Sequence, residues 1–203
     1  MRDTEEVVRE MKRIGSVVLC CIGVAAIGTG AAVADNGNST PNPRQVAAQQ
    51  CTAQLHAMGA KAFKAFYAKP AMQTCQGKQG KSAENTVNNA AQQCKAEQAD
   101  PNFATAHNGM TFDDFYGTNV NHRNAFGKCV SGKVQSTEAQ EQENLQNAAQ
   151  QCRAERADAS FAASHDGKSF TDFYGTNHNK KNAFGKCVSQ KAHEAGDEDG
   201  ATS

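Results

Sequence analysis

The chain is poor in the large side chains that build a hydrophobic core. Of its 203 residues none is Trp, three are Tyr and ten are Phe, so aromatic residues make up only 6% of the sequence. A large central sheet or barrel needs more bulky apolar side chains than this, which argues against either architecture. The composition instead favours several small units held together by covalent links.

An excess of charge of either sign is also missing. Lys and Arg together number 21, Asp and Glu together number 21, and the balance stays even when the first 34 residues are set aside. Proteins that bind nucleic acid through its phosphates carry a basic surplus, so the composition argues against that class of partner.

Signatures of common enzyme and metal sites are absent as well. The sequence has no G-x-S-x-G, no H-E-x-x-H and no Gly-rich loop of phosphate-binding form. Structural zinc needs closely spaced Cys or His ligands, whereas the two cysteines of each full repeat described below are separated by 34 residues. We therefore expect neither a metal nor a cofactor.

The first 34 residues have the organisation of an export signal. Four basic residues precede Ile14, an uncharged run covers 14–34, and it ends in Ala32-Val33-Ala34. We expect a signal peptide over 1–34, cleaved after Ala34. The alternative is an uncleaved membrane anchor, because 21 uncharged residues can cross a hydrocarbon layer of about 30 Å. The true start is either Met1 or Met11, and membrane contact is expected only through this segment.

The remainder of the chain contains one unit in three copies. A shift of 58 places Ala90–Ser131 on Ala148–Ser189 without a gap, and 29 of the 42 positions are identical. A shortened copy precedes them, with the same AAQQC opening at Ala47–Cys51, an aromatic pair at 66–67 and a closing Cys75. We predict a linker over 35–43, a truncated unit over 44–78, full units over 84–131 and 142–192, and a disordered acidic tail over 193–203.

All thirteen Phe and Tyr residues lie inside these units, which predicts that each unit has its own hydrophobic cluster. The polar connectors between the units, residues 76–82 and 131–142, are interpreted either as linkers or as solvated helix.

The periodicity inside a unit is helical. Leu145, Ala148, Ala149 and Cys152 follow the 0, 3, 4, 7 spacing of one helix face, and the last helix has a comparable face that includes Cys187. The aromatic residues between these helices are interrupted by Asp166-Gly167 and by Gly175, which predicts short helical turns. We expect Gly175 to end one turn and Asn177 or Asn179 to cap the final helix. No alternating strand pattern of useful length is present, so the predicted fold class is all-α.

Six cysteines follow the signal segment, two in each unit. Six cysteines permit fifteen pairings, and the repeat symmetry selects one of them, because a unit duplicated as a whole must pair its own thiols. The predicted disulfides are Cys51–Cys75, Cys94–Cys129 and Cys152–Cys187. Disulfides persist in exported proteins, and each bridge is expected to contribute about 3–4 kcal/mol, so reduction is expected to unfold the units.

Three polar side chains recur in both full units, and together they have the chemistry needed for acid–base catalysis: an acid, a base and a hydroxyl group. A structural role explains them more simply, because His165 adjoins a turn and Asp172 follows Ser169 at the spacing of a helix capping box. We therefore expect no catalytic residue, and we keep an enzyme as the alternative. The residues are His107, Asp114 and Tyr116 with their counterparts His165, Asp172 and Tyr174.

Basic residues form a modest edge at the start of the last helix of each full unit. They are a candidate contact surface for an acidic cell-envelope polymer or another surface protein, although a solvated helix face is the simpler interpretation. The residues are Arg123 and Lys128, with His122 beside them, and Lys180, Lys181 and Lys186.

The strongest motif in the chain is FYGTN-x-N-x-x-NAFGKCVS, at residues 115–131 and 173–189. It resembles a repeat found in uncharacterised exported proteins of high-GC Gram-positive bacteria. No activity or ligand is attached to that repeat, so the resemblance implies a bacterial envelope or extracellular location and not a function. The first unit lacks the Asn-rich part of the motif.

These observations predict an exported, non-enzymatic binding module, either secreted or at the cell surface. The alternatives are a small secreted enzyme and a purely structural envelope spacer. A binder made by duplication presents one surface several times and gains avidity. An enzyme needs one concave site with convergent polar groups, and a spacer needs no ligand.

Overall fold

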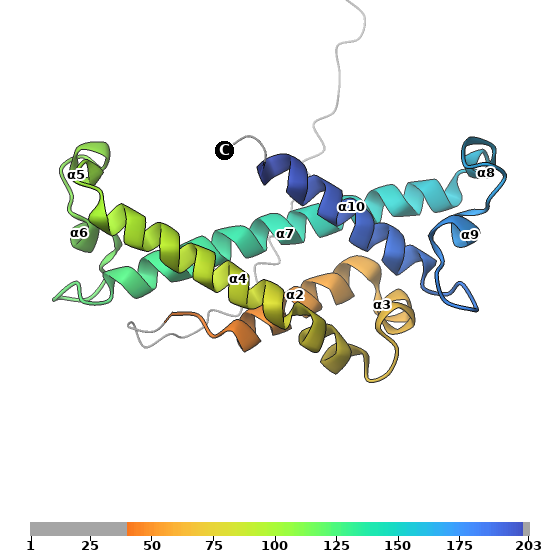
Figure 1. Cartoon of the computed structure of the whole chain (residues 1–203), viewed down its shortest axis with the longest axis horizontal. Helices are drawn as coiled ribbons and strands as arrows, with labels where there is room; N and C mark the ends of the chain where they lie inside the picture. The colour runs from red at the N-terminus through yellow and green to blue at the C-terminus, as the bar shows by residue number, and fades with distance from the viewer. Residues whose placement is uncertain (1–39, 201–203) are drawn as a thin grey trace, which may run out of the picture. The chain divides into compact units, whose positions relative to one another are not determined.

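The computed structural model describes residues 40–200, and the predicted signal segment at 1–34 lies outside this range. The described residues are helical with no strand, which confirms the all-α fold class (Figure 1). None of the described helices is long and apolar enough to cross a membrane. The helices are α2 (Pro43–Met58), α3 (Ala60–Tyr67), α4 (Ala71–Ala99), α5 (Phe103–Ala106), α6 (Phe112–Tyr116), α7 (Ala125–Ala157), α8 (Phe161–Ser164), α9 (Phe170–Tyr174) and α10 (Ala183–Gly200).

Two long helices join the three units. The connector at 76–82 lies inside α4 and the connector at 131–142 lies inside α7, so both adopt the helical alternative. Neither connector contains Pro, and buried side chains such as Ala83 and Val134 continue the apolar face of each helix. The last helix of one unit is therefore also the first helix of the next.

The three predicted disulfides are present. The Cα–Cα separations are 5.9 Å for Cys51–Cys75, 6.0 Å for Cys94–Cys129 and 6.0 Å for Cys152–Cys187, all within the normal range. The bonds tie α2 to α4, α4 to α7 and α7 to α10, which joins the opening helix of each unit to its closing helix.

The hydrophobic core is divided differently from the prediction. One cluster combines residues of the first and third units, including Phe63 and Tyr67 with Phe161 and Phe184. The second cluster belongs to the second unit and also includes Val46 of α2. The prediction of one cluster per unit is therefore wrong for the first and third units. The first unit lacks the segment that covers a full unit, and it buries its aromatic residues against α10 instead.

An arginine of the third unit forms a hydrogen bond to the first unit. A guanidinium nitrogen of Arg153 donates to the carbonyl oxygen of Ala57 at 2.8 Å. Arg153 and Arg156 also lie over the ring of Phe184, at 5.7 and 4.9 Å from its centroid. The corresponding positions of the second unit hold Lys95 and Gln98, which lack the planar guanidinium group.

The C-terminal segment is more ordered than predicted. Helix α10 continues to Gly200, so the disordered tail predicted for 193–203 is wrong as far as that residue, and 201–203 lie outside the described range. The first turns of α10 are fixed by burial of Ala183, Phe184 and Val188. A helix that is already nucleated extends at little cost, and Gln190 supports the extension by donating to Glu194 at 3.0 Å.

Candidate functional site

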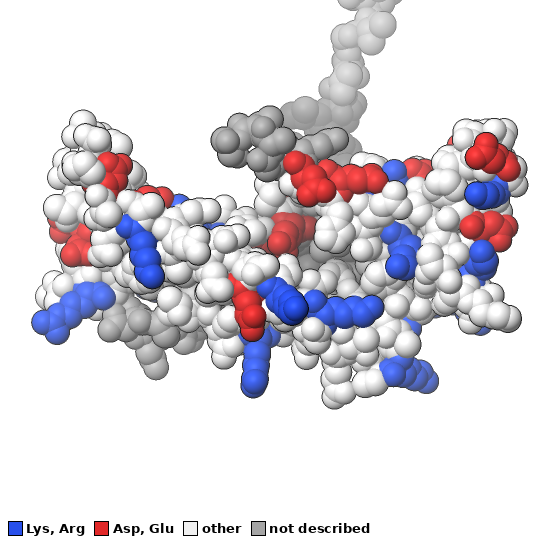
Figure 2. Space-filling view, in the orientation of Figure 1, with Lys and Arg blue, Asp and Glu red and all other residues white. Residues whose placement is uncertain are grey.

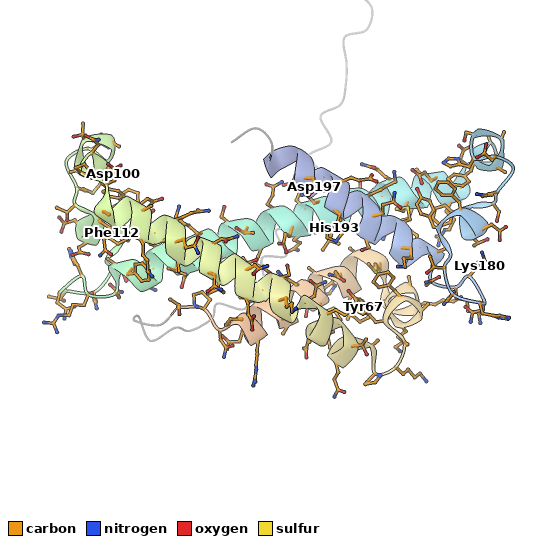
Figure 3. The ribbon with its side chains drawn as sticks, in the orientation of Figure 1. Tyr67, Asp100, Phe112, Lys180, His193 and Asp197 are labelled. Atoms are coloured by element: carbon orange, nitrogen blue, oxygen red, sulfur yellow. A yellow bond between two sulfur atoms is a disulfide. The ribbon has the colours of Figure 1, made fainter. Side chains whose placement is uncertain are left out.

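Each full unit has a cap, which we define as the segment between its two long helices. The second-unit cap is residues 100–124 and holds α5 and α6, and the third-unit cap is residues 158–182 and holds α8 and α9. The caps lie at opposite ends of α7, where Figure 3 labels Phe112 in one and Lys180 in the other. Because α7 has 33 residues, about 50 Å separates them.

The second short helix of each cap begins at a capping box. The Ser169 hydroxyl accepts from the backbone N–H of Asp172 at 3.2 Å and donates to the Asp172 carboxylate at 2.6 Å. Thr111 and Asp114 repeat the arrangement in the second-unit cap. The aspartates thus satisfy local helix ends, as their spacing from Ser or Thr indicates.

The two candidate histidines lie against phenylalanine rings. His165 stacks on Phe161 with ring centroids 3.8 Å apart, and its Nδ1 donates to the Phe161 carbonyl oxygen at 2.8 Å. His107 stacks on Phe103 at 3.9 Å with the same hydrogen bond. In the described part of the chain, no hydrogen bond links His165, Asp172 and Tyr174 to one another. The structure therefore does not assemble the three polar residues into a catalytic group.

The candidate tyrosines belong to a polar triad that the sequence analysis missed. The Tyr174 hydroxyl donates to Glu155 at 2.9 Å, and the other carboxylate oxygen of Glu155 lies 2.8 Å from the Lys191 ammonium group. The second unit repeats this triad with Tyr116, Glu97 and Lys133, at 2.7 and 2.6 Å.

The acceptor is the third residue after the first cysteine of each unit, and in the truncated unit Tyr67 donates to Gln54 at this position. In the two full units this acceptor is the Glu of the repeated sequence AAQQC-x-AE, so the repeat itself could have pointed to it.

Charge in the triad is stabilised by its partners. Burial disfavours the Glu97 carboxylate, but the hydrogen bonds from Lys133 and Tyr116 outweigh burial and lower the pKa of Glu97. Burial and the adjacent Glu97 carboxylate raise the pKa of Tyr116 to about 12, and burial with Glu155 raises the pKa of Tyr174 still further. These hydroxyls remain protonated donors at physiological pH, as a structural role requires.

The Asn-rich turn of the motif is organised by the last of its asparagines. The Asn182 side chain accepts from the backbone N–H groups of Thr176 and Asn177 at 3.1 and 3.3 Å and donates to the Thr176 hydroxyl at 2.9 Å. The predicted cap from Asn177 or Asn179 is therefore wrong, since Asn179 instead accepts from the N–H of Lys181.

Gly175 ends α9 as predicted, but for a steric reason. Its φ of −74° is open to any residue. A Cβ at this position would come within 2.4 Å of the Thr171 carbonyl oxygen.

The basic residues are divided between the second and third units and do not form one surface. Arg123 is exposed and Lys128 half-buried in the second unit, about 50 Å from Lys180, Lys181 and Lys186 in the third. Lys180 lies 4.0 Å from Asp172, and Lys181 is exposed. Figure 2 shows basic and acidic side chains next to one another over the third-unit cap.

A hollow beside the third-unit cap contains Lys186. It has a volume of about 340 Å³ and brings an exposed aromatic ring, a cation and hydroxyl and amide groups together. Phe173, at its edge, is 44% exposed, which is unusual for Phe. The lining residues are Phe173, Tyr174, Thr176, Lys186, Ser189 and Gln190.

The surface chemistry of the two caps has diverged. The second-unit cap has exposed Met110 and Val120 where the third-unit cap has Lys168 and His178. Residues 100–124 carry three aspartates and one arginine, whereas 158–182 carry three aspartates and three lysines. The buried framework and the exposed phenylalanine, Phe115 or Phe173, are therefore duplicated, whereas the charged positions around them differ.

Among the described residues, no group of three or more His, Cys, Asp or Glu side chains could hold a metal ion. The chain matches no protein-family model, no curated protein and no solved structure.

Proposed function

We propose that the protein is an exported, non-enzymatic binding module whose third-unit cap contacts an anionic polymer. The observation that carries this proposal is the hollow whose lining includes both the exposed Phe173 ring and Lys186. An aromatic face suits the apolar side of a sugar ring, and the ammonium group suits a carboxylate or phosphate on it. Thr176, Ser189 and Gln190 add hydroxyl and amide groups that orient such a ligand.

The location in this proposal rests on the cysteines and the N-terminal sequence. Three intra-chain disulfides favour an oxidising compartment, and the predicted signal at 1–34 supplies the route to it. With the motif's resemblance to exported bacterial repeats, these features support an acidic polymer of the bacterial envelope as the partner.

A non-enzymatic role is supported by the local contacts of the candidate polar residues. His165 packs on Phe161, Asp172 completes a capping box and Tyr174 donates to Glu155, so each has a structural partner. Because Met110 and Val120 replace basic positions in the second-unit cap, we assign the anionic partner to one cap and expect no avidity from the duplication.

The test is a binding measurement with the oxidised chain from Asp35 to Ser203. Calorimetry with a soluble polyuronate, and with its fully esterified uncharged form as control, should show salt-dependent binding of the charged polymer alone. Phe173→Ala and Lys186→Ala should each weaken binding about tenfold, a loss typical of a contact in the centre of a site.

The second unit provides the matched control variants. Phe115→Ala and Lys128→Ala change the corresponding residues of the second unit and should leave the affinity unchanged. Absence of binding to the charged polymer, or equal losses from the variants of both caps, would contradict the proposal. A reduced and alkylated sample should not bind, because the cap depends on the Cys152–Cys187 bridge.

A further inference from the structure

A buried amide joins two carboxylates at the contact between α2 and α7. The side-chain nitrogen of Gln50, on α2, donates to Glu138 at 2.9 Å and to Glu141 at 3.1 Å, both on α7. Gln50 is only 4% exposed, and its Oε1 atom is buried without a hydrogen-bond partner. Neither the caps nor the proposed ligand site involves these residues.

The two carboxylates lack a compensating ion pair. Glu138 and Glu141 are three residues apart and therefore lie on one face of α7, where both are half-buried. No described residue forms an ion pair with either of them. From α10, His193 lowers the pKa of Glu141 through its charge, and Figure 3 labels His193 where α10 crosses α7. From α2 the uncharged Gln50 reaches the two carboxylates, whereas Arg44 and His56 of that helix form no ion pair with either.

This environment favours the uptake of one proton. Burial and the repulsion from Glu141 raise the pKa of Glu138 to about 7, although the bond from Gln50 opposes the rise. Burial also raises the pKa of Glu141, against Gln50 and His193. Because the two groups interact, the proton belongs to the pair. Glu141 also lines a hollow of about 450 Å³ between α4 and α7, which gives water access to it.

We propose that Gln50, Glu138 and Glu141 form a pH-responsive junction that holds α2 against α7 more firmly as the pH falls below neutrality. In the protonated state, only one of the two carboxyl groups carries a charge, and Gln50 continues to donate to both. In the deprotonated state, two like charges face each other with one amide between them, which weakens the contact.

The direction of the pH effect follows from the raised pKa. A carboxyl group that takes up its proton more readily in the folded than in the unfolded chain destabilises the fold above its folded pKa. That cost disappears as the pH falls from about 7 toward the ordinary value of about 4.5. Acidification therefore strengthens the junction. The Cys51–Cys75 bridge keeps the first unit attached in either state, so the change is in packing and not in connectivity.

Thermal unfolding of the oxidised chain at pH 6 and pH 8 tests this inference. Glu138→Gln replaces the ionisable group by a neutral isostere, and it should remove most of the difference in Tm between the two pH values. A change of about 3–6 °C is expected for one titrating group of this kind in a chain of this size. Glu143→Gln, at an exposed position of the same helix, is the control and should retain the wild-type difference.

A difference in Tm that persists in Glu138→Gln would overturn the inference. If that variant does not fold, carbon-13 titration of the glutamate carboxyl groups in the wild-type chain decides, because one of them must titrate between pH 6 and 8. Addition of Ca²⁺ at pH 8 should not change the wild-type Tm. A rise that Glu138→Gln abolishes would assign the junction to a cation and contradict proton control.

Discussion

Position 185 requires glycine because the Phe66 side chain lies directly over it. A Cβ atom at this position would come within 2.7 Å of Cβ of Phe66, which is closer than real Cβ contacts allow. The close approach lets α3 lie directly on α10 and buries Phe184 in the core shared by the first and third units. The glycine in the NAFGKCVS part of the motif therefore has a packing role in the third unit.

Gly185→Ala should separate α3 from α10. We expect a loss of about 1–3 kcal/mol in the free energy of unfolding, because the Phe66 ring must move to admit the new methyl group. Urea unfolding measures the loss. Gly132→Ala is the matched control, since this helical glycine has no atom within 4 Å of the added Cβ. It should gain about 0.5–1 kcal/mol from helix propensity, and equal effects of the two changes would refute the packing role.

At the scale of the elements, α7 has to remain a continuous helix to hold the caps apart. Residues 131–142 connect the second and third units inside it, although their composition is also that of a polar linker. A flexible linker and a helix respond differently to proline, because proline removes a backbone donor and clashes with the preceding turn only in the helix.

Gln135→Pro distinguishes these possibilities. Gln135 is exposed in the middle of the connector, so its side chain contributes little to packing. The variant should lose about 3 kcal/mol of stability and part of its circular dichroism at 222 nm, whereas Gln135→Ala should be neutral or slightly stabilising. Unchanged stability of Gln135→Pro would show that the connector does not act as a helix.

The helices and the disulfides could be predicted from the sequence because both depend on local patterns. Apolar spacing places Cys94 and Cys152 on inward faces, and the duplication assigns their partners. The sharing of a core could not be predicted, because periodicity identifies a buried face but not the element that covers it. The hydrogen bond that holds the first unit on the third depends on Arg153, a single residue at which the two full units differ, because the second unit has Lys95 there.

In the candidate site, too, the local contacts could be predicted from the sequence and the long-range contacts could not. The capping role of Asp172 follows from its spacing to Ser169, and the structure confirms it. The acceptor for Tyr174 was missed, because Glu155 is 19 residues away and only folding brings the two together. The sequence identifies Lys186 as basic surface, but the prediction of a hydrophobic cluster in each unit does not indicate which aromatic residue, here Phe173, stays exposed in the same hollow.

For the whole molecule, the two cores imply two cooperative parts that do not correspond to the three repeats. One part contains most buried residues of the first unit with those of the third, including Cys51, Cys75 and Cys187, and the other contains the second unit with Val46 and Ala47 of α2. The first and third units therefore share a core although the second unit lies between them in the sequence. Regions that share a core are expected to open together.

Removal of the first disulfide tests this partition. Cys51→Ala with Cys75→Ala should cost about 3 kcal/mol, and the loss should reach α10 through the shared cluster while sparing α5 and α6. Amide hydrogen exchange measures both regions in one sample, with protection around Val188 expected to fall and protection around Phe112 expected to remain. Cys94→Ala with Cys129→Ala is the reciprocal control, and it should reverse this pattern because that bridge lies in the other cluster. Retained protection at Val188 in the first variant would mean that the repeats, and not the shared core, are the units of folding.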